Sequence, residues 1–206
     1  MTVGVRAARP GDGDAIARVW LSAAAYYADL DPAHFRVPSG QGLAGLFDKA
    51  ITDAGADVFQ FVAELNGRVV GWLSARVNHP DQDAAVELAR EHGWTRLIVE
   101  VLIVDGGQWR LGIGTVLLDR AESWGRDKGA RVARLGTCAR SPVAVPFYEE
   151  HAGYSRRAII FQKSCGVRIR RSMQGVRPVR PSPRPQVRLH RVSGTVVLAR
   201  LCPLSL

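Results

Sequence analysis

The chain of 206 residues has few cysteines, no long apolar run and no acidic residue after Glu150. Its three cysteines, Cys138, Cys165 and Cys202, are widely spaced and lie near no histidine pair with zinc-ligand spacing. This argues against a disulfide framework or a metal site and predicts free thiols in a reducing compartment. No apolar run approaches the roughly 20 residues that cross a bilayer, and the N-terminus lacks the apolar segment of a signal peptide. We therefore expect a cytoplasmic protein without a metal or a membrane partner.

The positive charge of the chain is concentrated at its C-terminal end. The net charge is +9, and nine arginines lie between Arg168 and Arg200, so that residues 1–163 are neutral as a whole. Residues 164–206 are rich in Arg and Pro and show no clear periodicity, which is typical of disordered segments. We expect a folded domain over 1–163 and a basic, disordered tail over 164–206. A solvated tail is favoured over one that binds nucleic acid, although nucleic acid stays an alternative.

The hydrophobic patterns predict strands interspersed with helices, and so an α/β domain with a mixed sheet. Asn66-Gly67 separates two runs rich in β-branched and aromatic residues, which is typical of a β-hairpin. Leu97–Val104 is nearly all apolar, as in a strand that is buried on both faces. The expected strands are Val3–Ala7, Val58–Leu65, Arg68–Val77, Leu97–Val104, Arg131–Ala139 and Tyr154–Lys163. The expected helices run from a cap at Asp12 or Asp14 to Tyr27, and over Ser39–Asp53, Ala84–Glu91, Gly112–Lys128 and Val143–Glu150.

The most informative segment is the strand, Gly-rich turn and amphipathic helix of Leu97–Gly129. Gly112 and Gly114 stand in the first turn of this helix, where free backbone N–H groups and the helix dipole attract an anion. A Walker P-loop requires Lys-Ser/Thr after its second Gly, but Thr115 follows Gly114. A Rossmann fingerprint requires a third glycine, which is absent here. The segment therefore predicts a phosphate or pyrophosphate site of another kind.

Four blocks of the sequence together resemble the GCN5-related N-acetyltransferase (GNAT) superfamily. The first is the strand, loop of about eight residues, Gly-x-Gly and helix described above. Glu100–Val104 is similar to the fourth strand of that family, in which a carboxylate precedes an apolar run. The hairpin Val58–Val77 resembles its second and third strands, and Ala144–Tyr154 resembles its closing A-x-x-F-Y…G-F/Y motif. The resemblance covers residues 3–163.

This resemblance implies an acyl-CoA N-acyltransferase-like fold with a mixed, mostly antiparallel central sheet, flanking helices and splayed fourth and fifth strands. It also implies acetyl-CoA as the cosubstrate. The expected cofactor-binding residues are Leu102, Ile103 and Val104 along the splayed strand, Trp109, Arg110, Leu111, Gly112, Ile113, Gly114 and Thr115 around the pyrophosphate, and Ser141 and Tyr148.

The chain departs from the family pattern at three positions. Trp109 occupies a position that is usually Arg or Gln, Gly106 one that is often Pro, and Ser141 one that is frequently Asn. We therefore expect the pyrophosphate to be held mainly by backbone N–H groups.

Two side chains are candidates for acid and base chemistry. Glu100 is the one carboxylate in an apolar strand, and we expect it to act as a general base, directly or through water. The alternative is that it faces solvent or pairs with an arginine. Tyr148 is the expected general acid for the departing thiolate, because a phenol is a neutral donor at pH 7; the alternative is a hydrogen-bonded core tyrosine. By resemblance, the acceptor pocket is shaped by the region of Tyr26, Tyr27, His34 and Phe35.

The sequence thus predicts an N-acetyltransferase that transfers acetyl from acetyl-CoA to a primary amine by direct attack in a ternary complex. The acceptor is a small-molecule or peptide amine, and a homodimer is possible. Three alternatives stay open: a non-catalytic coenzyme A-binding sensor or regulatory module, transfer to a protein N-terminus or lysine, and transfer to aminoacyl-tRNA. Segments 26–55 and 78–95, which set acceptor choice, carry no pattern that separates these.

Overall fold

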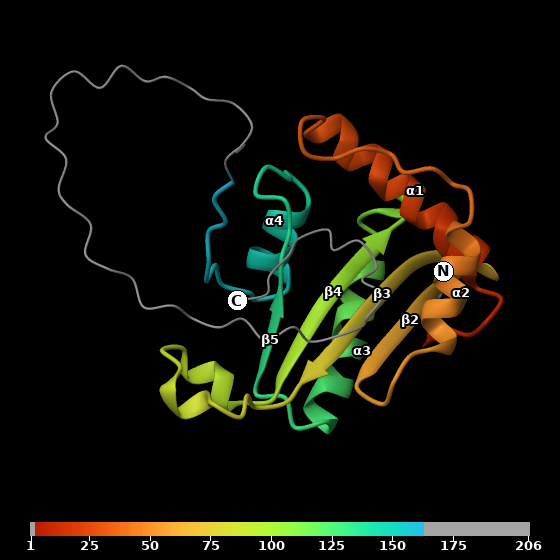
Figure 1. The fold of residues 1–206 in the computed structure, drawn as a ribbon. Helices are drawn as coiled ribbons and strands as arrows, with labels where there is room; N and C mark the ends of the chain where they lie inside the picture. The colour runs from red at the N-terminus through yellow and green to blue at the C-terminus, as the bar shows by residue number, and fades with distance from the viewer. Residues whose placement is uncertain (1–2, 163–206) are drawn as a thin grey trace, which may run out of the picture. The chain divides into compact units, whose positions relative to one another are not determined.

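Five strands form one twisted sheet in which the order in space follows the order in sequence. The computed structural model describes residues 3–162, so the expected tail and its two cysteines lie outside the described residues. The first four strands pair antiparallel and the fifth runs parallel to the fourth (Figure 1). The mixed, mostly antiparallel sheet that the sequence predicts is therefore confirmed. The strands are β1 Val3–Ala7, β2 Val58–Leu65, β3 Arg68–Asn78, β4 Arg96–Val104 and β5 Val132–Leu135.

Helices cover both faces of the sheet. Helix α1 (Gly13–Leu30) and helix α2 (Leu43–Thr52) lie on one face, and helix α3 (Ile113–Asp127) lies on the other (Figure 1). Residues 3–162 also contain five shorter elements, which are η1 Ala84–Val86, η2 Arg90–Gly93, η3 Gly106–Gln108, α4 Ala144–Pro146 and η4 Phe147–His151. This arrangement leaves two separate apolar layers, one on each side of the strands.

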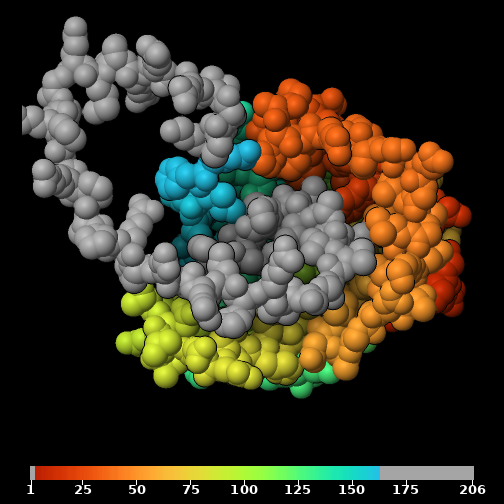
Figure 2. Space-filling view, viewed as in Figure 1, coloured from red at the N-terminus to blue at the C-terminus, as the bar shows by residue number. Residues whose placement is uncertain are grey.

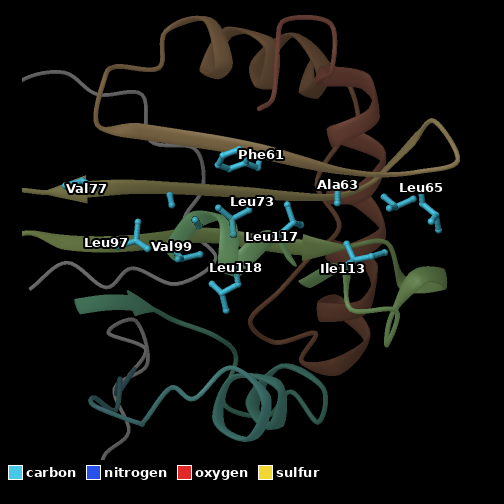
Figure 3. Packing of buried hydrophobic residues seen from close by; sticks show 13 residues of the cluster. Phe61, Ala63, Leu65, Leu73, Val77, Leu97, Val99, Ile113, Leu117 and Leu118 are labelled. Carbon is cyan, nitrogen blue, oxygen red and sulfur yellow. The ribbon is translucent and has the colours of Figure 1, made fainter. Parts of the chain in front are cut away.

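The larger apolar layer lies between the sheet and α3, as Figure 3 shows. Leu73 from β3 and Leu117 from α3 are fully buried in it, and Leu97 is 1% exposed. On the opposite face, the Trp72 ring packs edge-on against Trp20 of α1 and Phe47 of α2. Successive side chains of β3 therefore point into opposite apolar layers, because side chains alternate between the two faces of a sheet.

The contact between β4 and β5 is short. The two strands pair only where Arg96–Val99 lies beside Val132–Leu135. On its other edge β4 pairs with β3, but the register passes from Val101 to Val99, so that Glu100 is an extra residue in a β-bulge. Beyond Val99, the β5 side of β4 has no strand partner within residues 3–162. The expected splay of the fourth and fifth strands is thus present.

The predicted last strand at Tyr154–Lys163 is wrong over its described part. Residues 155–162 have no regular secondary structure and take part in no β-ladder. The β-branched Ile159 and Ile160 favour extended backbone, but a strand also needs a neighbour that pairs with its N–H and C=O groups.

Several element boundaries also differ from the prediction. The helix expected over Ala84–Glu91 is two short 3₁₀ turns, and the helix expected from Ser39 begins only at Leu43. The strand expected over Arg131–Ala139 is shorter because only four of its residues pair with β4. The last expected helix divides into α4 and a π-type turn, η4. For β5 the length is set by its pairing with β4, which the sequence pattern does not contain.

The first helix is capped by a carboxylate other than the two predicted candidates, Asp12 and Asp14. Asp12 makes no side-chain cap, because both of its oxygens accept hydrogen bonds from Arg6, at 2.7 and 2.8 Å. These bonds are the main reason that the pKa of Asp12 lies below its ordinary value. The N–H groups of Gly11 and Gly13 instead donate to Asp48 of α2, each at 2.9 Å. One side chain thus both caps α1 and joins it to α2.

This junction requires glycine at position 13, and the change Gly13→Ala tests it. A Cβ there overlaps the carbonyl oxygen of Ala44 and lies 2.7 Å from Cγ of Asp48. We expect Gly13→Ala to lower the free energy of unfolding by about 2 kcal/mol or more, measured by urea denaturation. The matched control is Gly45→Ala in α2, where a Cβ meets nothing within 4 Å; it should be neutral or stabilise by up to about 1 kcal/mol. Equal effects of the two changes would contradict this packing.

Candidate active site

Free backbone N–H groups converge where β4 leads into α3. After Val104 the chain makes the η3 turn, and Gly112 then takes a left-handed conformation (φ 76°) directly before α3 begins. Within residues 3–162, none of the backbone N–H groups from Trp109 to Thr115 donates a hydrogen bond. The positive end of the α3 dipole lies at the same place. The cradle, as we call residues 109–115, is therefore suited to bind an anion with several oxygen atoms.

Gly114 lets another part of the chain approach the cradle closely. A Cβ at this position would lie 3.4 Å from Cζ of Phe147, on η4. The aromatic ring therefore packs against bare backbone at the first turn of α3. The Gly-x-Gly pattern thus has two local functions here, a left-handed turn at Gly112 and close packing at Gly114.

Trp109 anchors the cradle to the end of β4. Its indole Nε1–H donates to the carbonyl oxygen of Val104 at 2.9 Å. Its ring meets Tyr26 of α1 edge-on, with centroids 4.8 Å apart, and the Tyr26 hydroxyl lies 3.2 Å from Oγ of Ser141. Trp109 therefore holds the loop in place through α1 and the segment before α4.

Ser141 is buried and its hydroxyl is already engaged. The side chain is 2% exposed, and its Oγ accepts the N–H of Ala144 at 3.0 Å. This bond caps the short helix α4. The structure thus connects Ser141 to the cradle through Tyr26 and Trp109, and its predicted contact with a cofactor stays a prediction.

The unpaired edge of β4 offers backbone groups beside the cradle. Asp105 N–H donates to Val70 on β3, and backbone groups of antiparallel strands alternate in direction. Leu102 and Val104 therefore direct their N–H and C=O groups away from β3, toward the open edge. Trp109 occupies the oxygen of Val104, which leaves both backbone groups of Leu102 available. Ile103 points its backbone to β3 and its side chain is 4% exposed.

A cavity lies where β4 and β5 diverge, with a volume of about 420 Å³ including its open mouth. It contains Glu100 and Tyr148 together, although 47 positions separate them in the sequence. The cavity is lined by Tyr27, Phe35, Val99, Glu100, Val101, Leu102, Leu135, Gly136, Thr137, Cys138 and Tyr148. The two residues predicted to perform acid and base chemistry are therefore parts of one site.

Glu100 faces this cavity and also contacts an arginine. Its Oε1 lies 2.9 Å from Nε of Arg76 on β3, and the two side chains are 34% and 32% exposed. The alternative to a catalytic role is that Glu100 faces solvent or pairs with an arginine. In the structure its carboxylate does both, since it is paired with Arg76 and partly open to solvent. The sequence pattern gave no sign of Arg76, because only the pairing of β3 with β4 brings it to Glu100.

Tyr148 is half-buried among aromatic rings. Its ring lies between Phe147 and Tyr154, with centroids 5.1 and 6.0 Å away, and no described residue bonds to its hydroxyl. Burial is the main reason that the pKa of Tyr148 lies well above its ordinary value, and the nearby Tyr27 raises it further. The hydroxyl therefore keeps its proton at neutral pH and is available as a donor. Tyr148 also packs against the apolar core, and its role as the general acid stays a prediction.

Comparison with known proteins identifies the family. A family model described as "Acetyltransferase (GNAT) family" matches residues 22–154. The chain belongs to the GNAT family. The resemblance seen in the sequence is therefore confirmed. None of the curated proteins compared with the chain matches it.

Solved structures share the GNAT fold at low sequence identity. A mutant protein from Bacillus halodurans has 14% identity and a TM-score of 0.67, over 78% of this chain and 99% of that one. A transcriptional regulator from Bacillus halodurans C-125 has 21% identity and a TM-score of 0.60, over 79% and 99%. An aminoglycoside N-acetyltransferase, AAC(6')-Iy in complex with CoA, has 15% identity and a TM-score of 0.54, over 80% and 96%. These likenesses concern the fold alone.

Residues 3–162 contain neither a cluster of metal-ligating side chains nor a helix that could cross a membrane. Among residues 3–162, no three side chains of His, Cys, Asp or Glu come together as a possible metal site. Over the same range, no helix has both the length and the apolar character that crossing a membrane requires.

The buried state of Tyr148 predicts a dependence of stability on alkaline pH. Its pKa in the folded protein is above the ordinary value of 10.0, so above pH 10 the folded state binds the phenolic proton more tightly than the unfolded chain. Its contribution to stability is complete below pH 10 and decreases as the pH rises further. We expect the free energy of unfolding, measured in urea between pH 8 and 11, to fall above pH 10. The fall should be less steep in Tyr148→Phe; an identical profile in the variant would contradict the burial of this phenol.

Proposed function

We propose that the protein is an N-acetyltransferase that transfers acetyl from acetyl-CoA to a primary amine by direct attack. The observation that carries this proposal is the position of three features along one strand. The unpaired edge of β4 has the cradle at its end, Glu100 at its bulge and Tyr148 across the cavity. A thioester bound along this edge lies next to both an acid and a base.

The residues present fit coenzyme A. The unbonded N–H groups of residues 109–115 suit a pyrophosphate, since they need an acceptor that the rest of the described chain does not provide. The free N–H and C=O of Leu102 suit the amide groups of an extended pantetheine arm, much as a strand adds to a sheet edge. Trp109 provides no charge to this site, so the proposed binding rests on backbone donors and the α3 dipole.

When bound, acetyl-CoA supplies a thioester carbon to which the amine nitrogen bonds while the C–S bond breaks and the sulfur leaves with its electron pair. Glu100 takes the proton that the amine loses, directly or through one water molecule. Tyr148 donates its phenolic proton to the departing sulfur, because a phenol is protonated at neutral pH and can serve as a neutral donor. One proton thus moves from the amine to Glu100, and a second moves from Tyr148 to the sulfur. Exchange with solvent then returns both side chains to their starting protonation states.

A negative charge placed in the cradle tests the binding step. Thr115 is exposed in the first turn of α3, where a carboxylate favours the helix but repels a pyrophosphate. We expect Thr115→Glu to lower the affinity for coenzyme A about tenfold or more, measured by calorimetry, without loss of thermal stability. Ser123→Glu, two turns further along the same helix, is the control and should bind normally. Equal affinities of both variants for coenzyme A would show that the cradle does not bind it.

Removal of the acid and the base tests the chemical step. We expect Glu100→Gln and Tyr148→Phe each to lower kcat about 100-fold while the affinity for coenzyme A stays within about threefold. Both changes keep the shape of the side chain. Thiol release from acetyl-CoA in the presence of an amine panel measures the rate. Turnover at the original rate in both variants would contradict these roles.

The same experiment separates an enzyme from a regulatory protein of this fold. If coenzyme A binds but no amine raises thiol release above the rate of hydrolysis, the chain is a binding module. The similar fold of a protein described as a transcriptional regulator shows that the fold alone does not decide this question.

A further inference from the structure

Arg76 lies on the sheet face outside the area that the helices cover. On β3 it shares a face with Ser74 and Trp72, and Trp72 packs under α1 and α2. In Figure 1 the C-terminal half of β3 extends beyond these two helices. In the space-filling view, α1 and α2 lie at the upper right, and the yellow-green segment around η1 and η2 lies at the lower left (Figure 2). Arg76 is therefore next to the cavity on a part of the sheet that carries no helix.

The guanidinium of Arg76 has unused hydrogen-bond donors. Its Nε is 2.9 Å from the Glu100 carboxylate, yet it has no properly aligned hydrogen bond and is buried. Among residues 3–162, Glu100 is the carboxylate that contacts Arg76, and this contact is made by Nε and not by the two terminal nitrogens. An arginine offers five N–H donors in a planar fork that matches a carboxylate. Most of this fork is thus available to a ligand at the Glu100 end of the cavity.

A second arginine, Arg134, lies in the same row of the sheet as Arg76. Ile98 of β4 is opposite Arg76 on one side and beside Arg134 of β5 on the other, so the three residues share one row and one face. Arg134 is 31% exposed and its nearest carboxylate, that of Glu91, is 3.4 Å away. Both arginines of this row are paired with carboxylates, Arg76 with Glu100 and Arg134 with Glu91, and both side chains are partly open to solvent.

From this juxtaposition we propose that the acceptor is a zwitterion, a small primary amine with a carboxylate one or two carbon atoms away. Resting on the proposed function, this assigns the amine to Glu100 and the carboxylate to Arg76. In such a molecule the amine nitrogen and the carboxylate are close neighbours, as the Glu100 carboxylate and the Arg76 guanidinium are in the structure. Arg76 is a specificity-determining residue in this account.

The charges of the site also act against other acceptors. A simple cationic amine meets a carboxylate that Arg76 already neutralises, and it brings no group for the free donors of the guanidinium. A protein N-terminus has a peptide bond in place of the nearby carboxylate. An amino acid therefore gains an ion pair that the other two classes of acceptor lack.

The test compares amino acids with their carboxamides, which have the same skeleton without the negative charge. The ratio of kcat/KM between the two forms is measured for the unchanged protein, Arg76→Gln, Arg76→Lys and the control Arg126→Gln on α3. We expect a ratio of at least about ten in favour of the acid, lost in Arg76→Gln and partly kept in Arg76→Lys. Arg126→Gln should keep the ratio. The ratio cancels any effect of Arg76 on the reactivity of Glu100, because that effect is common to both forms.

The outcomes separate this inference from the function on which it rests. If carboxamides or simple amines react as well as amino acids in the unchanged protein, the zwitterion is wrong and the acetyltransferase stands. The inference also fails if the ratio is unchanged in Arg76→Gln. If coenzyme A binds and no amine of any class is acetylated, both fail. The first comparison uses only the unchanged protein, so it holds even if Arg76→Gln folds poorly.

Discussion

The site depends on one strand that is paired on both edges for only half of its length. β5 accompanies β4 over Arg96–Val99 and then diverges, and the bulge at Glu100 marks the same point. A strand edge without a partner leaves polar backbone groups that must find water or a ligand. Here they face a cavity instead of another strand. The cradle, the base and the acid are all arranged around this edge.

Trp109 shows how the cradle keeps its shape without the usual Arg or Gln of the GNAT family. Its indole N–H donates a hydrogen bond to the carbonyl oxygen of Val104, at the end of the open edge of β4. Its ring packs against Tyr26. Tyr26 in turn reaches Ser141, which caps the segment that carries Tyr148. The cost is that position 109 itself provides no positive or amide side chain, although Gln108 and Arg110 stand on either side of it. The benefit is a loop whose free N–H groups are fixed before the ligand arrives.

Local sequence signals were sufficient where backbone conformation decides the structure. Asn66 and Gly67 have φ values of 52° and 75°, as a tight hairpin turn requires, and Gly112 has the left-handed conformation that precedes α3. Pairing between distant segments was not readable in this way. The position of Arg76 beside Glu100 and the end of β5 at Leu135 both depend on the register of the sheet. The capping of α1 by Asp48 has the same cause, since nearby Asp12 is the stronger local candidate.

The central claim is that the backbone N–H groups of residues 109–115 bind the pyrophosphate of coenzyme A. The most direct measurement is an amide ¹H–¹⁵N NMR titration of the protein with coenzyme A. The account predicts that the amide resonances of Gly112, Ile113, Gly114 and Thr115 move most, because hydrogen bonds to an anion shift amide protons strongly. Binding that moves other amides and leaves these four unchanged would contradict it.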